Sequence, residues 1–166
     1  MIITYNKENC EKRNFPEKIL KGIKKHTIRE DKTNRWKVGR TMQHYAMNPR
    51  NGGKQFAEGI CTGVFKIKIL PSRDMIIIWS NIHPLHSHNL YHIDVLNKFA
   101  VEDGFEDWEE MKEYFKTYFS GVVIWWDPKC IEATQYRDIP IVPYGQEKGI
   151  TAEEIKMLDG CIKCKE

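Results

Sequence analysis

The stretch FPEKILKGIKKHTIREDKTNRWKVG, residues 15–39, decides the fold that this sequence predicts. Its first part, Phe15–Leu20, has the apolar spacing of a short amphipathic helix, with a proline in the first turn. Gly22 tolerates a positive φ and is expected to end that helix. Residues 24–29 then predict a turn that enters a β-strand, and Gly39 predicts a tight turn before the next strand.

Cations are dense in this strand and its entry turn, where Lys24, Lys25 and Arg29 lie beside Thr27 and Glu30. One interpretation is a solvated basic edge strand, which native sheets use to block pairing with other edges. The other is a functional site, because the order of these residues matches a known pattern.

That pattern is an amphipathic helix, then G-x-K-K-x-T-I-R, then W-x-x-G, and it resembles the start of ASCH domains, which are PUA-like barrels associated with RNA. The segment AVEDGFEDWEEMKEYF at 100–115, followed by an apolar run at 122–126, is similar to the second half of the same family. The resemblance spans residues 15–126. It implies an α+β fold, mainly β: a mostly antiparallel, partly open PUA-like β-barrel with three flanking helices. We expect this domain at 1–126, followed by a C-terminal extension at 127–166.

The rest of the chain predicts further elements. Alternation of apolar and charged residues predicts a strand at 60–70 that pairs antiparallel with 75–79, with a bulge at Gly63. Helices are expected with Asp94 and Asp107 at their N-caps. The other expected elements are strands at 2–5, 41–47 and 122–126, polar loops at 6–14 and 80–92, and a short helix at 151–160.

Length and composition narrow the class of protein. A chain of 166 residues fits one domain with an appendage. No run approaches ~18 consecutive apolar residues, so we expect no transmembrane helix and no membrane partner. The N-terminus lacks the features of a signal peptide. Five cysteines, an odd number, argue against a disulfide framework and predict a reduced, cytoplasmic protein. No obligatory protein partner is inferred.

Charge is distributed unevenly along the chain. Residues 1–54 hold 14 Lys and Arg against 5 Asp and Glu, a net charge of +9, whereas residues 94–119 hold 3 Lys against 8 acids, a net charge of −5. A basic N-terminal part is the footprint expected for a phosphate-bearing partner. The alternative is that the two segments face each other in the fold.

The resemblance implies two functions of different class. Some ASCH proteins are presumed RNA binders, and others are small amidohydrolases that remove the acetyl group from N4-acetylcytidine. The active residues of the amidohydrolases correspond here to Lys24, Thr27 and Asp103, with Glu102 as the competing acid. For binding of RNA or a modified nucleoside, cations contact phosphate and aromatic rings stack on bases. The binding residues that we assign are Lys25, Arg29, Arg35, Trp36, Arg40 and Tyr45, with Trp79 as a further stacking candidate.

Geometry decides between these functions. An ideal strand would point Lys24 and Thr27 to opposite faces, so they converge only if Lys24 lies in the turn after Gly22. A lysine in a closed pocket has its ammonium form disfavoured and becomes available as a base. The discriminating feature is therefore whether an acid reaches Lys24.

The sequence contains two clusters of residues that could bind a metal ion. Four histidines at 83–92 form a third, weaker candidate site, for RNA cleavage or a metal, but no cysteine or carboxylate has a familiar ligand spacing beside them. Cys161 and Cys164 form a single C-x-x-C pair, which does not complete a zinc site. We therefore expect no metal and no cofactor.

Overall fold

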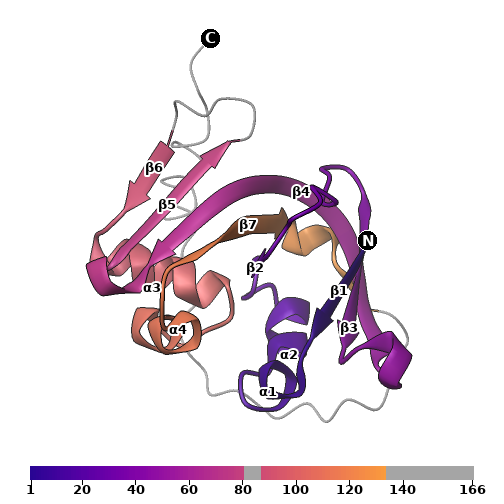
Figure 1. Cartoon of the computed structure of the whole chain (residues 1–166). Helices are drawn as coiled ribbons and strands as arrows, with labels where there is room; N and C mark the ends of the chain where they lie inside the picture. The colour runs from indigo at the N-terminus through magenta and orange to yellow at the C-terminus, as the bar shows by residue number, and fades with distance from the viewer. Residues whose placement is uncertain (81–86, 134–166) are drawn as a thin grey trace.

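A computed structural model describes residues 1–80 and 87–133 and has a mixed α+β fold, mainly β, as Figure 1 shows. Eight strands form one sheet that does not close on itself. The strands are β1 (Ile2–Tyr5), β2 (His26–Arg29), β3 (Thr41–Ala46), β4 (Lys54–Leu70), β5 (Met75–Ser80), β6 (Ser87–Leu90), β7 (Phe119–Trp126) and β8 (Glu132–Ala133). The helices are α1 (Lys7–Glu11), α2 (Phe15–Leu20), α3 (Ile93–Glu102) and α4 (Trp108–Phe115), with short 3-10 turns η1 (Pro49–Asn51), η2 (Pro71–Arg73) and η3 (Pro128–Cys130).

The sheet is organised around β4, which arches across the molecule in Figure 1. The order is β1-β3-β4-β5-β6, and β7 joins β4 to β2. Strand pairs are antiparallel except β1 with β3, so the mostly antiparallel sheet is confirmed. The register of β4 against β7 shifts between Cys61 and Gly63, which confirms the bulge predicted at this glycine.

The two faces of this sheet carry two cores. The inner core lies within the curl of β1, β3, β7 and the first half of β4, where α2 covers it with Phe15 and Ile19. The outer core lies between the sheet and the helices α3 and α4, where Ile67 and Ile69 of β4 contact Leu96 and its neighbours. Because side chains of a strand alternate between faces, β7 contributes to both cores. In β4 the register shift between Cys61 and Gly63 turns Ile67 and Ile69 to the face opposite that of Cys61.

The curl brings the ends of the sheet together without pairing them. In the described residues β1 and β2 form no ladder with each other. Arg29 of β2 instead reaches across, and its Nη2 donates a hydrogen bond to the carbonyl oxygen of Thr4 at 2.8 Å. The Arg29 guanidinium also lies 5.4 Å from the ring centre of Tyr5. One arginine side chain therefore bridges the opening between the two edges.

Two elements lie where the sequence predicted polar loops. Helix α1 occupies the expected loop at 6–14, and Asn6 caps it by accepting a hydrogen bond from the backbone N–H of Asn9 at 2.8 Å. Strand β6 lies in the expected loop at 80–92 and pairs with β5, although its sequence SHNL has no β-branched residue. Both loop predictions are wrong because capping and edge pairing stabilise short polar segments that lack apolar periodicity. The described residues thus hold four α-helices rather than three.

Several predicted bounds shift. Helix α3 begins at Ile93 with His92 at its N-cap, so Asp94 lies in the first turn and does not cap the helix. Asp107 caps α4 as predicted, and its side chain accepts from the backbone N–H of Glu110. The remaining differences are a β4 that begins at Lys54, ahead of the strand expected at 60–70, and a β3 that ends at Ala46 instead of residue 47.

The described start of the C-terminal extension belongs to the sheet. Strand β8 pairs with β4 through Ala133 and Ala57, and Ile131 packs against the inner core. The described chain thus continues the fold beyond the boundary expected after Trp126. The predicted helix at 151–160, the C-x-x-C pair and the first two histidines of the histidine tract lie outside the described residues.

Candidate functional site

A buried triad of charged and polar side chains lies where β2 begins and α3 ends. The Lys24 side chain has no exposed surface, and its Nζ lies 3.0 Å from Asp103 Oδ1 and also donates to the backbone carbonyl of Asp103. The Nδ1 atom of His26 lies 3.1 Å from the same carboxylate oxygen. The Lys24 ammonium also lies 4.3 Å from the ring centre of Phe15. An acid therefore does reach Lys24, and that acid is Asp103.

Backbone geometry holds the triad together. The N–H of Lys25 donates to the carbonyl oxygen of Glu102 at 2.8 Å, which ties the start of β2 to the last turn of α3. Gly104 then reverses the chain with a φ of +96°. A Cβ atom at this position would lie 2.8 Å from Phe15 and 3.0 Å from Lys24, so only glycine allows this close approach.

Burial and charge set the protonation of the triad. Burial lowers the pKa of Lys24 to about 8, and the Asp103 carboxylate beside it opposes this shift. For Asp103 burial alone would raise the pKa, but Lys24 and His26 outweigh it and hold the pKa below its ordinary value. Burial also lowers the pKa of His26. At neutral pH the carboxylate is therefore ionised and His26 is neutral, with its Nδ1–H donating to Asp103.

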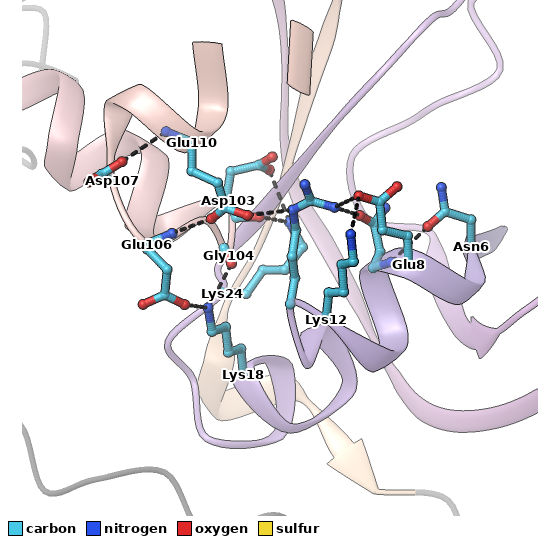
Figure 2. A network of polar contacts seen from close by, with 12 residues as sticks. Asn6, Glu8, Lys12, Lys18, Lys24, Asp103, Gly104, Glu106, Asp107 and Glu110 are labelled. Atoms are coloured by element: carbon cyan, nitrogen blue, oxygen red, sulfur yellow. Dashed lines mark hydrogen bonds and ion pairs between the residues drawn. The ribbon is translucent and has the colours of Figure 1, made fainter. Parts of the chain in front are cut away.

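The triad belongs to a row of ion pairs between the N-terminal segment and the helices α3 and α4. The described residues show four such pairs, and Figure 2 shows Lys18 and Lys24 directed toward Asp103, Gly104 and Glu106. The pairs are Arg13–Glu110 at 2.8 Å, Lys18–Glu106 at 2.7 Å, Lys24–Asp103 at 3.0 Å and Lys25–Glu102 at 2.7 Å. The basic and acidic segments therefore do face each other, which was the alternative explanation of the charge pattern.

The middle of the inner core contains a second polar group. The Tyr5 hydroxyl lies 3.0 Å from His44 Nδ1, and the rings of His44 and Trp126 meet edge to face with centres 5.0 Å apart. Burial, with the charges of Lys24 and Arg29, lowers the pKa of His44 to about 3, so its ring is neutral. Burial raises the pKa of Tyr5, which keeps the hydroxyl protonated.

Four aromatic ring nitrogens are buried without a hydrogen-bond partner in the part of the chain that the structure describes. They are Trp36 Nε1, His44 Nε2, Trp126 Nε1 and His26 Nε2. Indole nitrogens only donate, so the two tryptophans leave unused donors against the inner core. Buried polar groups without partners are rare in native proteins and need an explanation, such as a bound ligand or water.

One of these tryptophans, Trp36, lines a pocket. The pocket has a volume of about 430 Å³ and is lined by Asp31, Asn34, Trp36, Lys37, Val64 and Lys66. Trp36 is only 5% exposed, and the Arg35 guanidinium lies 4.6 Å from the centre of its ring. The lining of this pocket thus combines the Trp36 ring with the cations Lys37 and Lys66, and we call it the Trp36 pocket.

A larger hollow of about 900 Å³ lies between α1, α4 and η2. Three of its charged residues already form ion pairs: Arg13 pairs with Glu8 and Glu110, and Lys112 pairs with Asp74 and Glu109. Its lining contains no buried polar group that lacks a partner. The smaller Trp36 pocket is therefore the better candidate site.

The other expected site residues lie in different places. Thr27 is buried and shares the inner face of β2 with Arg29 by strand alternation. Lys25 is paired with Glu102 and Arg29 with Thr4, so both cations are engaged within the fold. Tyr45 follows the buried Met42 and His44 in the alternation of β3 and so lies on the outside of this strand. Arg40 directly precedes β3 and is exposed.

Sequence reasoning missed three residues of the site: Tyr5, His26 and His44. His26 stands inside the segment that drew attention, but its alternation with Thr27 gave no sign that it would face Asp103. Tyr5 and His44 come from different strands, and the parallel pairing of β1 with β3 brings them together. Strand alternation in the sequence places Tyr5 and His44 each on the buried face of its own strand. It does not predict that the two strands are neighbours.

The described residues contain no group of three or more His, Cys, Asp and Glu side chains placed to hold a metal ion, and none of their helices is long and apolar enough to cross a membrane. Among known proteins, no family model, no characterised protein and no solved structure matches this chain. The class of protein is therefore defined by its fold and site alone: a mainly β protein with a curled open sheet, a buried Lys–Asp–His triad and an aromatic pocket with a basic rim.

Proposed function

We propose that this protein is an ASCH-type, PUA-like module that binds RNA or a modified nucleoside, acts in the cytoplasm and holds the base in the Trp36 pocket. The single observation that carries the proposal is this pocket, which is lined by Trp36 together with Lys37 and Lys66. The indole N–H of Trp36 is buried and lacks a partner in the described structure. Its volume lies in the range of ~300–1,000 Å³ typical of small-molecule sites.

The chemistry of the lining suits a nucleobase. A buried indole N–H needs an acceptor, and the carbonyl oxygens of pyrimidines supply one. The ammonium groups at the rim complement phosphate. Arg13 and Lys25 are paired with acids of the fold, whereas Lys37 and Lys66 line the pocket. Their positions, rather than the net charge of +9 in residues 1–54, support binding.

Calorimetric titration with cytidine and N4-acetylcytidine tests this proposal. We expect saturable binding by the wild-type protein and a loss of about 0.5–1.5 kcal/mol of binding free energy in Trp36→Phe, which keeps an aromatic ring but removes the N–H donor. Tyr118→Phe, at an exposed position between α4 and β7, is the matched control and should bind as the wild type does. If neither nucleoside nor a single-stranded RNA binds, the proposed function is wrong.

Amidohydrolysis of an acylated cytidine is the second candidate, and the triad favours it. The pKa of Lys24, lowered to about 8, provides a neutral amine at mildly alkaline pH, next to an ionised acid. In this reaction the amine takes a proton from water, the hydroxide attacks the acyl carbon, and the C–N bond breaks as the proton passes to the leaving nitrogen. The products are cytidine and acetate. Lys24 has no exposed surface and its ammonium lies against the Phe15 ring, so a substrate reaches it only if the residues that cover it move. This ranks catalysis second.

Hydrolysis is tested by incubating the protein with N4-acetylcytidine and measuring the cytidine released. If the second candidate is correct, the wild type turns the substrate over and the variant Lys24→Met/Asp103→Asn, which removes both charges together, does not. The rate should rise as the pH passes through the lowered pKa of Lys24, because the neutral amine is the base. Turnover by the double variant at the wild-type rate would contradict this role for Lys24.

A further inference from the structure

A strip of cationic and aromatic side chains leads away from the Trp36 pocket along β4 and β5. Lys66 and Lys68 alternate with Ile67 and Ile69, which lie in the outer core, so both lysines lie on the other face of the sheet. Trp79 of β5 is the direct cross-strand partner of Lys66. The Nζ atom of Lys68 lies 5.5 Å from the centre of the Trp79 ring. We call Lys66, Lys68 and Trp79 the β4–β5 strip.

The strip and the pocket are continuous. Lys66 belongs to both: it lines the pocket, and its Nζ donates to Asn34 Oδ1 at 3.2 Å. Directly opposed side chains on neighbouring strands have their Cβ atoms ~4.5–5.5 Å apart, so the half-buried Trp79 lies immediately beside the pocket wall. Lys68 follows two residues further along the strand, ~7 Å from Lys66.

We propose that the natural ligand is a single strand of RNA rather than a free nucleoside. One base enters the Trp36 pocket, the neighbouring base stacks on Trp79, and Lys66 and Lys68 contact the phosphates between and beyond them. This inference rests on the proposed function and adds the class of ligand. A free nucleoside would leave Trp79 and Lys68 without a role, whereas a strand uses both.

The composition of the strip favours a single strand. Stacking on a tryptophan requires an unpaired base with an open face, which a duplex does not offer. Alternating cations and a ring on one sheet face are the combination by which proteins hold single strands with little sequence preference. Asp31 is a carboxylate in the pocket lining, where it accepts a hydrogen bond from the backbone N–H of Arg35 at 3.1 Å.

Binding of an oligocytidylate RNA and of free cytidine to the full-length protein tests the inference. We expect the wild type to bind the strand more tightly than cytidine. Trp79→Ala should weaken strand binding about tenfold or more and leave cytidine binding unchanged. Lys68→Ala should reduce the slope of log affinity against log salt by about 0.7, the value for one phosphate of a single strand. Tyr114→Ala, on the helical side of the molecule, and Lys7→Ala, on α1, are the matched controls.

The outcomes separate the inference from the function on which it rests. A strand that binds no more tightly than cytidine, or a Trp79→Ala protein that loses affinity for both ligands equally, overturns the inference and leaves nucleoside binding intact. Equal affinity for duplex RNA also overturns it, because paired bases offer no open face to Trp79. Failure of the wild type to bind either cytidine or the strand removes the proposed function itself. Circular dichroism of each variant verifies that it is folded.

Discussion

Replacing Lys24 by methionine lowers the free energy of unfolding by about 3–5 kcal/mol, the cost expected when one partner of a buried ion pair is removed. Methionine fills a similar volume, so the loss does not come from a cavity. It comes from Asp103, whose carboxylate is left buried with only the neutral His26 beside it. Urea denaturation of the two proteins at neutral pH measures the difference.

Two further variants show whether charge is the cause. Lys24→Met/Asp103→Asn should recover most of the lost stability, because the asparagine carries no charge and still accepts the hydrogen bond from His26. Lys7→Met removes a lysine from the exposed pair Lys7–Glu11 and should change stability by less than about 0.5 kcal/mol. If Lys24→Met costs no more than Lys7→Met, the buried pair does not stabilise the fold.

Wild-type stability relative to Lys24→Met/Asp103→Asn should rise by about 3 kcal/mol between pH 8 and pH 10.5. The folded protein holds the pKa of Lys24 at about 8, below the 10.5 of an ordinary lysine. Between these values the unfolded chain binds more protons than the folded protein, so the free energy of unfolding increases with pH. Below pH 8 the lysine is charged in both states and the difference is constant.

The comparison with the double variant removes the other groups that titrate in this range. Burial raises the pKa of both Cys10 and Cys61, so these thiols lower stability as the pH rises, but they do so equally in both proteins. Denaturation curves at matched ionic strength across the pH range give the difference directly. A flat difference between pH 8 and pH 10.5 would show that Lys24 has an ordinary pKa in the folded state.

Apolar periodicity predicted the elements that carry the cores. The alternation at 60–70 placed Ile67 and Ile69 on one face, and the pairing with 75–79 followed. The resemblance to ASCH domains assigned Lys24 and Asp103 to one site, with Glu102 as the competing acid. In the structure Lys24 pairs with Asp103, whereas Glu102 pairs with Lys25. The PUA-like assignment itself stays a prediction, since the fold shows only a mainly β architecture with an open sheet.

The burial and pairing of charged side chains were the features that the sequence predicted least well. The excess of cations in residues 1–54 predicts an exposed basic surface. Lys24 and Lys25 instead form ion pairs with acids about 80 positions later in the chain. Hydrophobic patterning reports which residues are buried, and a charged side chain gives no such signal until its partner is known. For the same reason, no local pattern distinguished the buried Glu102 from the exposed Glu106.

The row of ion pairs has a consequence for synthesis of the chain. Lys24 and Asp103 are 79 positions apart, and translation proceeds at ~5–20 residues per second. The basic segment is therefore made about 4–16 s before its acidic partners leave the ribosome. Contacts this distant in sequence also give a high contact order, which slows folding. Throughout that interval Lys24 and Lys25 lack Asp103 and Glu102, so these two ion pairs form only after α3 has been synthesised.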